Sequence, residues 1–381
     1  MKKLKTLHLA SFDGNIGDNA NHYGFYKHLR KNQDFNFEIE KLEIREFYWK
    51  QRSFDESFVE LVNSYDLLII GGGNYFELWV DGSPTGTSIA IELQRLRQIK
   101  TPILINALGV DPGQGASEGN IIKFRNFLDT LIKRGDFISI RNDGAKKAII
   151  DHVGEQYLEH ISWTPDAGFF IDVDEPSAYY KDKKYIAINV AYDMQDVRFR
   201  GCDGKLSYQG FLREFKCFMD AFLDRYKGFE IVFVPHIYRD ITFINDILNL
   251  LDDDVRRRKI SVGPLLHGDS SFKEVMSVYA GAQCVLANRF HANICSIGLE
   301  VPTIGLVNYR QIQELYNEMD SDNYVDLTKE GYNRALMEKV GMLIMENQSS
   351  RKPRVLASMM EHYNANTQKI TNWLLEKYRV H

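Results

Sequence analysis

The run ANRFHANICSIGLEVPTIGL at residues 287–306 decides the fold class of this chain. A short apolar strand ends at Arg289, and a helical segment rich in small residues begins near His291. A second apolar strand then begins at Pro302. A strand, a tight turn, a helix and another strand in this order are typical of a parallel sheet with a crossover helix. The run therefore predicts an α/β protein.

The same alternation of strands and helices extends through both halves of the chain. In the first half, the expected strands are Leu4–Ala10, Phe37–Ile44, Asp66–Ile70, Pro102–Leu108 and Asp136–Ile140, and the expected helices are Asp18–Arg30, Gly86–Lys100 and Gly119–Arg134. In the second half, the expected strands are Tyr185–Val190, Glu230–Val234, Gln283–Ala287 and Thr303–Leu306, and the expected helices are Tyr208–Tyr226, Ile241–Leu251, Ser271–Ala280 and His291–Leu299.

A length of 381 residues exceeds what one core usually holds, so we expect two domains. The polar stretch Asp172–Lys184 has no apolar period and is interpreted as the linker. The predicted domains are residues 1–175 and 176–350. Residues 351–381 contain an amphipathic helix, Arg354–Tyr378, of the kind that often packs back on the first lobe of two-lobed folds.

Composition restricts the class of partner. Lys and Arg number 47 and Asp and Glu 52, so no bulk attraction to nucleic acid is expected, and a few local cations would have to hold any anionic substrate. No apolar stretch approaches the ~18 residues of a membrane helix, which predicts a cytoplasmic protein with at most peripheral contact at the inner face of a membrane. The four cysteines lack CxxC spacing and are expected to be buried thiols, and no motif such as HExxH predicts a metal.

Two glycine-containing loops follow strands of the first half. The first loop contains Gly14, Asn15, Gly17 and Asp18, and a helix follows it. A helix N-terminus can bind an anion, although a plain turn capped by Asp18 explains the loop equally well. The second loop is Gly71–Asn74, in which Gly72, Gly73 and Asn74 would allow a ligand or another backbone to approach closely.

Two arginines and two histidines follow buried strands. Arg141 comes directly after an expected strand, where ligands bind in open parallel sheets, with a surface ion pair as the alternative. Arg289 precedes His291 by two residues at a helix N-terminus, and this pair can hold an anion and supply a proton. His236 follows the strand Glu230–Val234 and fits a structural or a functional role equally.

These pieces in this order resemble the polysaccharide pyruvyl transferase family over roughly residues 7 to 315. The motifs that carry the resemblance are Gly14–Ala20, Gly71–Asn74, Ser139–Arg141, Thr164–Ala167, Pro235–His236 and Arg289–His291 continuing to Tyr309. Two departures from the family pattern, Asn142-Asp143 after Arg141 and Arg310-Gln311 after Tyr309, concern acceptor identity more than chemistry.

The resemblance implies two Rossmann-like lobes similar to GT-B glycosyltransferases, with phosphoenolpyruvate as donor substrate in the cleft between them and no further cofactor. It implies that Arg141 and Arg289 bind the donor and that His291 is the general acid. For the general base, Asp166, Asp13, Asp18 and Glu77 are candidates, of which Asp166 is the expected catalytic residue. The substrate-binding residues expected besides the two arginines are His236, Asn15, Asp18, Gly72, Gly73 and Asn74.

The expected acceptor is a sugar of a surface glycan or its precursor, on which the pyruvyl group closes a cyclic ketal. The sequence leaves open whether that acceptor is lipid-linked, nucleotide-linked or a finished polymer. One alternative is a GT-B glycosyltransferase that uses a nucleotide sugar, since fold does not fix function. The other is a non-catalytic carbohydrate-binding protein on the same fold. Against the last stands the presence of Arg141, Arg289 and His291, because an inactive relative would be expected to lose at least one of them.

Overall fold

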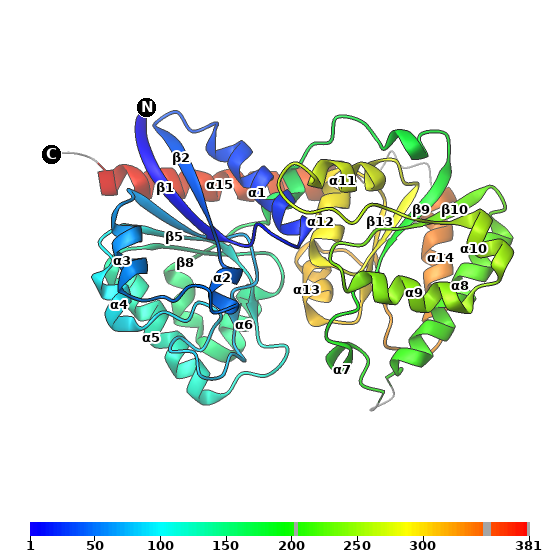
Figure 1. Ribbon diagram of the computed structural model, residues 1–381, viewed down its shortest axis with the longest axis horizontal. Helices are drawn as coiled ribbons and strands as arrows, with labels where there is room; N and C mark the ends of the chain where they lie inside the picture. Colours follow the sequence, from blue (N-terminus) through cyan, green and yellow to red (C-terminus); the bar gives the residue numbers. More distant parts are fainter. Residues whose placement is uncertain (202–204, 346–351, 379–381) are drawn as a thin grey trace. The chain divides into compact units, whose positions relative to one another are not determined.

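The computed structural model describes residues 1–201, 205–345 and 352–378 (Figure 1). The chain forms two compact units. The first contains Met1–Asp13, His22–Ala167 and the C-terminal segment from Ser358, and the second contains Gly14–Asn21 and Gly168–Ala357. The expected boundary at residue 175 lies beyond the break after Ala167, because Phe169 already packs against Gly298 of the second unit.

The first unit is built on a parallel sheet of six strands in the order β2-β1-β3-β5-β7-β8. The strands are β1 (Lys2–Ala10), β2 (Phe35–Glu43), β3 (Leu67–Gly71), β5 (Ile103–Leu108), β7 (Phe137–Ile140) and β8 (Ile161–Trp163). The helices are α1 (Ile16–Leu29), α2 (Arg45–Tyr48), α3 (Glu56–Asn63), α4 (Leu93–Gln98), α5 (Glu118–Arg134) and α6 (Ala145–Ala148). From β1 the chain first adds β2 on one side of the sheet and then β3 and the later strands on the other side. The carboxyl ends of β1 and β3 therefore flank a topological switch point.

The second unit repeats the plan with the strand order β11-β10-β9-β12-β13-β14, again all parallel. The strands are β9 (Lys184–Asn189), β10 (Phe229–Phe233), β11 (Ile260–Val262), β12 (Cys284–Ala287), β13 (Thr303–Val307) and β14 (Tyr324–Asp326). The helices are α7 (Gln195–Arg198), α8 (Tyr208–Arg225), α9 (Asp240–Leu250), α10 (Asp253–Lys259), α11 (Phe272–Ala280), α12 (Phe290–Gly298), α13 (Arg310–Glu318) and α14 (Tyr332–Met345). The strands run 3-2-1-4-5-6 in chain order, as in dinucleotide-binding folds, with the switch point between β9 and β12.

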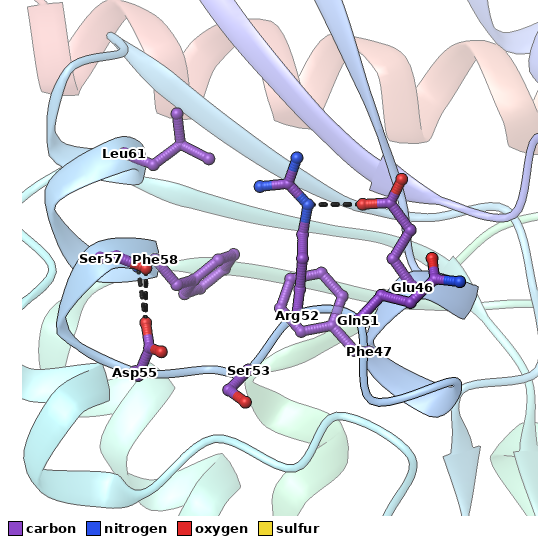
Figure 2. Close-up of a pocket in the computed structure, with 9 residues that line it drawn as sticks. All are labelled: Glu46, Phe47, Gln51, Arg52, Ser53, Asp55, Ser57, Phe58 and Leu61. Atoms are coloured by element: carbon purple, nitrogen blue, oxygen red, sulfur yellow. Dashed lines mark hydrogen bonds and ion pairs between the residues drawn. The ribbon is translucent and has the colours of Figure 1, made fainter.

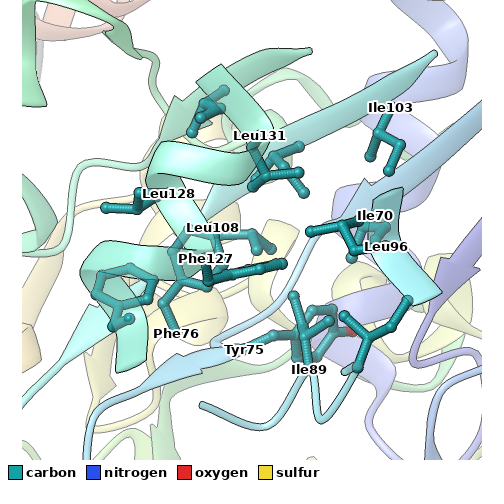
Figure 3. Close-up of a cluster of buried hydrophobic side chains, with 14 of the residues drawn as sticks. Ile70, Tyr75, Phe76, Ile89, Leu96, Ile103, Leu108, Phe127, Leu128 and Leu131 are labelled. Atoms are coloured by element: carbon teal, nitrogen blue, oxygen red, sulfur yellow. The ribbon is translucent and has the colours of Figure 1, made fainter. Parts of the chain in front are cut away.

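Each sheet is buried by apolar side chains from its own strands and helices. In the first unit, Phe76, Phe127 and Leu131 pack on Ile70 and Leu108 of the sheet (Figure 3). In the second, Phe211, Phe215 and Phe222 of α8 belong to the cluster that covers the strands. Because both faces of these strands are covered, the strands are continuous apolar runs, and this is why sequence periodicity locates them.

Helix α15 (Lys352–Tyr378) extends along the first unit in Figure 1. From Ser358 onward it belongs to that unit. Its Trp373 donates a hydrogen bond from Nε1 to the carbonyl of Gly135 at 2.9 Å and lies against the Phe137 ring. Leu374 is fully buried. None of the helices in the described ranges is long and apolar enough to cross a lipid bilayer.

Two sequence expectations are wrong in detail. The helix expected over Gly86–Lys100 is only α4, because Ser83, Thr85 and Thr87 bond to one another and to loop backbone in place of a helical ladder. The thiols of Cys284 and Cys295 are buried as expected, but Cys217 is exposed on α8. Cys202 lies outside the described residues.

Candidate functional site

In the second unit, two asparagines fix the chain at the switch point. Asn189 ends β9, and its Oδ1 accepts the backbone N–H of Arg289 at 2.9 Å. Asn288 follows β12, and its Oδ1 accepts the backbone N–H of Ala191 at 2.9 Å. This reciprocal exchange locks the end of each strand to the segment that follows its neighbour. The backbone from which the Arg289 side chain projects is therefore rigid.

Arg289 lies between two carboxylates. Its Nε donates to Oδ2 of Asp240 at 2.8 Å and its Nη2 to Oδ1 at 2.5 Å, a bidentate pair in which Asp240 is almost fully buried. The same Nη2 donates to Asp193, which comes from the loop after β9. Burial alone would lower the pKa of Arg289, but the charges of Asp240 and Asp193 outweigh it and raise that pKa. Arg289 is thus a permanently charged, oriented donor.

A second arginine that the sequence analysis did not single out lies beside it. Arg198 of α7 donates from Nη1 to Oδ1 of Asn308 at 2.8 Å and from Nε to the carbonyl of Asp193 at 2.9 Å. Its Nη2 lies 3.6 Å from Oδ2 of Asp193, and its guanidinium lies 5.2 Å from the centre of the Tyr309 ring. The sequence analysis also did not single out Asp193. Its position shortly after a buried strand, like that of Arg289, is the signal that could have identified it.

His291 occupies the first turn of α12 and packs against the start of α1. A Cβ at Gly17 would lie 2.5 Å from the Cβ of His291, so only glycine permits this approach. Oδ1 of Asp18 lies 3.5 Å from Nδ1 of His291, with both side chains nearly buried. The carboxylate is placed to orient the imidazole.

The loop before α1 differs from the expected capping arrangement. The helix begins at Ile16, and Oδ1 of Asn15 accepts the N–H of Gly17 at 3.2 Å. Asn15 therefore occupies the cap position, where it meets one of the unpaired N–H groups of the helix N-terminus. Asp18 lies one turn further in, which releases its carboxylate from capping and lets it face His291.

His236 is fully buried and lies next to Asp240. Its Nε2 and the Tyr279 hydroxyl share a hydrogen bond of 2.8 Å, and its backbone N–H donates to Oδ2 of Asp240 at 2.9 Å. Burial, and after it the charges of Arg289 and His291, hold the pKa of His236 well below its usual range. The backbone N–H of His236 supports Asp240 and so, indirectly, Arg289, whereas its imidazole is held by Tyr279.

The first unit contains the Arg141 cluster at the end of β7. Nε of Arg141 donates to Oδ2 of Asp143 at 2.7 Å, and its Nη1 lies 3.7 Å from Oδ2 of Asp166. The three side chains are all about 3% exposed or less. Asp166 also donates its backbone N–H to Oδ1 of Asn142 at 2.9 Å. This arrangement is a buried ion-pair network rather than the surface pair considered from the sequence.

The glycine-rich loop after β3 approaches this cluster. Asn74 donates from Nδ2 to Oδ2 of Asp111 at 3.3 Å. A Cβ at Gly109 would lie 2.3 Å from Oδ1 of Asn74, 2.6 Å from Asp143 and 2.9 Å from Nη2 of Arg141. Gly72 has φ +84°, and a Cβ at Gly73 would lie 2.4 Å from the Tyr75 ring. At Gly73 and Gly109 the close approach therefore comes from neighbouring protein groups, whereas at Gly72 glycine is favoured by the positive φ.

A partly exposed carboxyl, Glu77 of β4 (Phe76–Glu77), lies beyond Asn74. It accepts a short hydrogen bond from Ser88 and pairs in register with Asp111 of β6 (Val110–Asp111). Burial raises the pKa of Glu77 to about 7, the bond from Ser88 opposes this, and the charge of Asp111 adds to it. Carboxyls perturbed in this way are over-represented among general bases. Asp166, in contrast, is fully buried against Arg141.

A pocket of about 510 Å³ opens on the first unit between α2 and α3 (Figure 2). Phe47, Phe58 and Leu61 contribute apolar walls, and its cation, Arg52, is paired with Glu46 at 2.5 Å. No residue expected from the sequence to be functional lines it. Across the described ranges, no group of three or more His, Cys, Asp or Glu side chains is arranged to hold a metal ion.

Solved structures show the class of fold. The chain aligns with the complex of MnaA and UDP from S. aureus at 12% identity and a TM-score of 0.55, covering 97% of this chain and 98% of that one. UDP-GlcNAc 2-epimerase from Methanocaldococcus jannaschii aligns at 12% identity and 0.54, covering 93% and 95%. An α,α-trehalose-phosphate synthase (UDP-forming) from Burkholderia vietnamiensis aligns at 9% identity and 0.54, covering 97% and 99%. The protein thus has a GT-B-like fold of two parallel α/β units.

The family follows from the sequence itself. The model of the polysaccharide pyruvyl transferase family matches residues 15–309, and the chain belongs to that family. The match includes the Arg141 cluster, Arg289 and His291. No protein among those with curated descriptions matches the chain.

Proposed function

We propose that this transferase moves the pyruvyl group of phosphoenolpyruvate onto two hydroxyls of a sugar, forming a cyclic ketal and releasing phosphate. The observation that carries the proposal is the pair Arg289 and His291 at the start of α12. The arginine is held with fixed orientation by Asp240, and the imidazole faces the Asp18 carboxylate. A fixed guanidinium suits a phosphate or carboxylate, and a histidine beside a carboxylate suits proton donation.

In the proposed mechanism, His291 donates a proton to the terminal vinyl carbon of phosphoenolpyruvate. The adjacent carbon becomes an oxocarbenium-like centre, and one sugar hydroxyl attacks it and loses its proton to a base. A second hydroxyl then displaces phosphate at the same carbon, gives its proton to the leaving phosphate and closes the ketal. Each ring oxygen gains one bond to carbon, and the phosphate leaves with the electron pair of the broken C–O bond.

We assign the base to Glu77 in preference to Asp166. Glu77 is partly exposed and has a pKa of about 7, so its carboxylate form is available at neutral pH and can take a proton. Asp166 is fully buried beside Arg141, which suits holding that arginine in place. Arg141 is buried between Asp143 and Asp166, and we propose it as a positioning residue in place of the substrate-binding role expected from the sequence.

Binding measured by calorimetry tests the donor. Phosphoenolpyruvate should bind saturably to the full chain, and Arg289→Lys should weaken binding by about 10-fold or more, since a bidentate donor is lost. The exposed ion-pair variant Lys3→Gln is the matched control and should bind as wild type does. Heat from a nucleotide sugar but none from phosphoenolpyruvate would instead favour the glycosyltransferase alternative.

The aligned structures include a complex with UDP and a UDP-GlcNAc 2-epimerase, which makes a nucleotide-linked sugar a reasonable acceptor to test first. We propose a panel of nucleotide-linked and lipid-linked sugars, each with phosphoenolpyruvate present. The acceptor should be the compound that triggers phosphate release. A non-catalytic carbohydrate-binding protein would release none with any acceptor.

A further inference from the structure

We infer that Arg198 and Arg289 together form the anion-binding site for the donor, and that the Asp193 carboxylate occupies this site until the donor displaces it. The inference rests on the proposed function for the identity of the donor, but the anion site itself can be tested separately. It adds Arg198 as a substrate-binding residue and Asp193 as a residue that sets the affinity.

The geometry of Asp193 is that of a bound anion. One carboxylate oxygen, Oδ1, accepts from Nη2 of Arg289, and the other, Oδ2, lies 3.6 Å from Nη2 of Arg198. Two guanidinium groups thus share a single carboxylate, one at each oxygen. A substrate carboxylate, or two oxygens of a phosphate, has the same pair of acceptors at a similar spacing.

The place in the fold is also that of a ligand site. Asp193 follows β9 and Arg289 follows β12, the two strands on either side of the switch point of the second unit. Ligands of open α/β sheets bind outside the carboxyl ends of the strands at this point. The helix α12 begins directly after Arg289, so its N-terminus adds a favourable field for an anion.

Of the two carboxylates on Arg289, Asp193 is the one that can leave. Asp240 makes two hydrogen bonds to Arg289 and accepts the backbone N–H groups of His236 and Ile237, with 1% of its side chain exposed. Asp193 makes one short contact with Arg289, and 20% of its side chain is exposed. Asp240 is thus a fixed part of the site, whereas Asp193 can turn toward solvent.

Charge balance explains why such a carboxylate would be present. Two arginines buried without a counter-charge would carry a large desolvation cost, and Arg198 is 8% exposed and the Arg289 side chain 14%. Asp193 and Asp240 make the group of four neutral. When a donor anion replaces Asp193, the negative charge of the ligand takes the place of the aspartate charge beside the two arginines.

The experiment is calorimetric titration of the full chain at pH 7.5 with inorganic phosphate and, separately, with phosphoenolpyruvate. Asp193→Asn removes the competing charge and retains the size of the side chain, so both ligands should bind about 10-fold more tightly, since like charges brought together are repelled. Arg198→Gln should weaken both by about 10-fold or more. Glu230→Gln is the matched control, because it removes one negative charge at the opposite end of the same sheet, where Glu230 pairs with Lys183.

The thermal melting of each variant should be measured alongside the titrations. If Arg198→Gln proves to be unfolded, the affinities of Asp193→Asn alone test the inference. Tighter phosphate binding in Asp193→Asn, with wild-type affinity in Glu230→Gln, supports the inference. This holds even if phosphoenolpyruvate binds no more tightly than phosphate. That result would support the anion site and contradict phosphoenolpyruvate as the donor. Unchanged or weaker binding of both ligands in Asp193→Asn would overturn the inference.

Discussion

Arg141 and Arg289 are held in similar ways in the two units, and the difference between them is exposure. Each arginine follows a buried parallel strand and lies between two aspartates. The first has partners that are 2% and 0% exposed, whereas one partner of the second, Asp193, is 20% exposed. The same sequence feature, an arginine at a strand end, has produced one fully buried ion-pair network and one with a partly exposed partner.

A strand-end arginine therefore indicates a binding site only together with its partners. Arg141 is fixed by Asp143 and Asp166, and its cluster continues through Asn74 and Asp111 toward Glu77. Arg289 is fixed by Asp240 and retains a replaceable neighbour. We therefore propose that the Arg289 cluster binds the donor. In the Arg141 cluster, Arg141, Asp143 and Asp166 are proposed to have a positioning role.

The largest expected effect is at His291, beside the open cluster. His291→Ala should lower turnover by about 10²–10⁴-fold, the range expected for loss of a general acid, with little change in donor affinity. Steady-state rates together with calorimetry separate the two quantities. The exposed His152→Ala is the control and should behave as wild type. Wild-type turnover in His291→Ala would remove the chemical role from the second unit.

The closed cluster should matter most for stability. Arg141→Ala leaves Asp143 and Asp166 buried without their cation and should cost about 3–5 kcal/mol in the free energy of unfolding. Arg289→Ala should cost less, because Asp193 can turn to solvent. Denaturant titration of both variants measures the difference, with the exposed pair variant Lys3→Ala as the control, whose stability should stay close to that of wild type. Equal losses in the two arginine variants would contradict the distinction between closed and open clusters.

A smaller effect is expected at the contact between α1 and α12. Gly17→Ala would bring a Cβ within 2.5 Å of the Cβ of His291, and neither atom can rotate away. We expect a loss of about 1–3 kcal/mol from overpacking, together with reduced turnover as the imidazole moves. Gly119→Ala is a suitable control, because a Cβ there meets no atom within 4 Å. A fully active and stable Gly17→Ala would show that the position of His291 does not depend on this approach.

The pH dependence of Glu77 should be the mildest test. Its pKa is raised from 4.5 to about 7, so the folded protein holds this proton more tightly than the unfolded chain does. This contribution to stability is present below about pH 4.5 and is lost as the pH rises through 7. Stability should therefore fall less between pH 5 and 8 in Glu77→Gln than in wild type. As a base, Glu77 should also give a rate that rises toward a plateau above pH 7, and a rate profile unchanged in Glu77→Gln would exclude that role.

Much of the fold could be predicted because its strands are buried on both faces. The expected strand Gln283–Ala287 matches β12 (Cys284–Ala287) within one residue, and Thr303–Leu306 matches β13 equally closely. The edge strands β8, β11 and β14 were missed, since three residues give too little pattern. The helix expected from Gly86 was wrong because side-chain hydroxyls within the loop replace helical hydrogen bonds, which no periodicity reveals.

The candidate site could be predicted only where its residues are close in sequence. Arg289 and His291 are two residues apart and follow a recognisable strand, so their pairing was visible. Asp240 and Asp193 reach Arg289 from positions 49 and 96 residues away, and the pairing depends on strand order, which the sequence does not state. Arg198 lies in a short helix after an irregular loop and gave no signal at all.

We propose phosphoenolpyruvate as the source of the transferred group, and one measurement tests this directly. The enzyme is incubated in D₂O with phosphoenolpyruvate and the acceptor panel, and phosphate and sugar products are followed by NMR. We predict equal amounts of phosphate and of a new ketal whose methyl group carries one deuterium, with both formed about 10²–10⁴-fold more slowly by His291→Ala. Consumption of a nucleotide sugar with release of its nucleotide, while phosphoenolpyruvate stays intact, would contradict it.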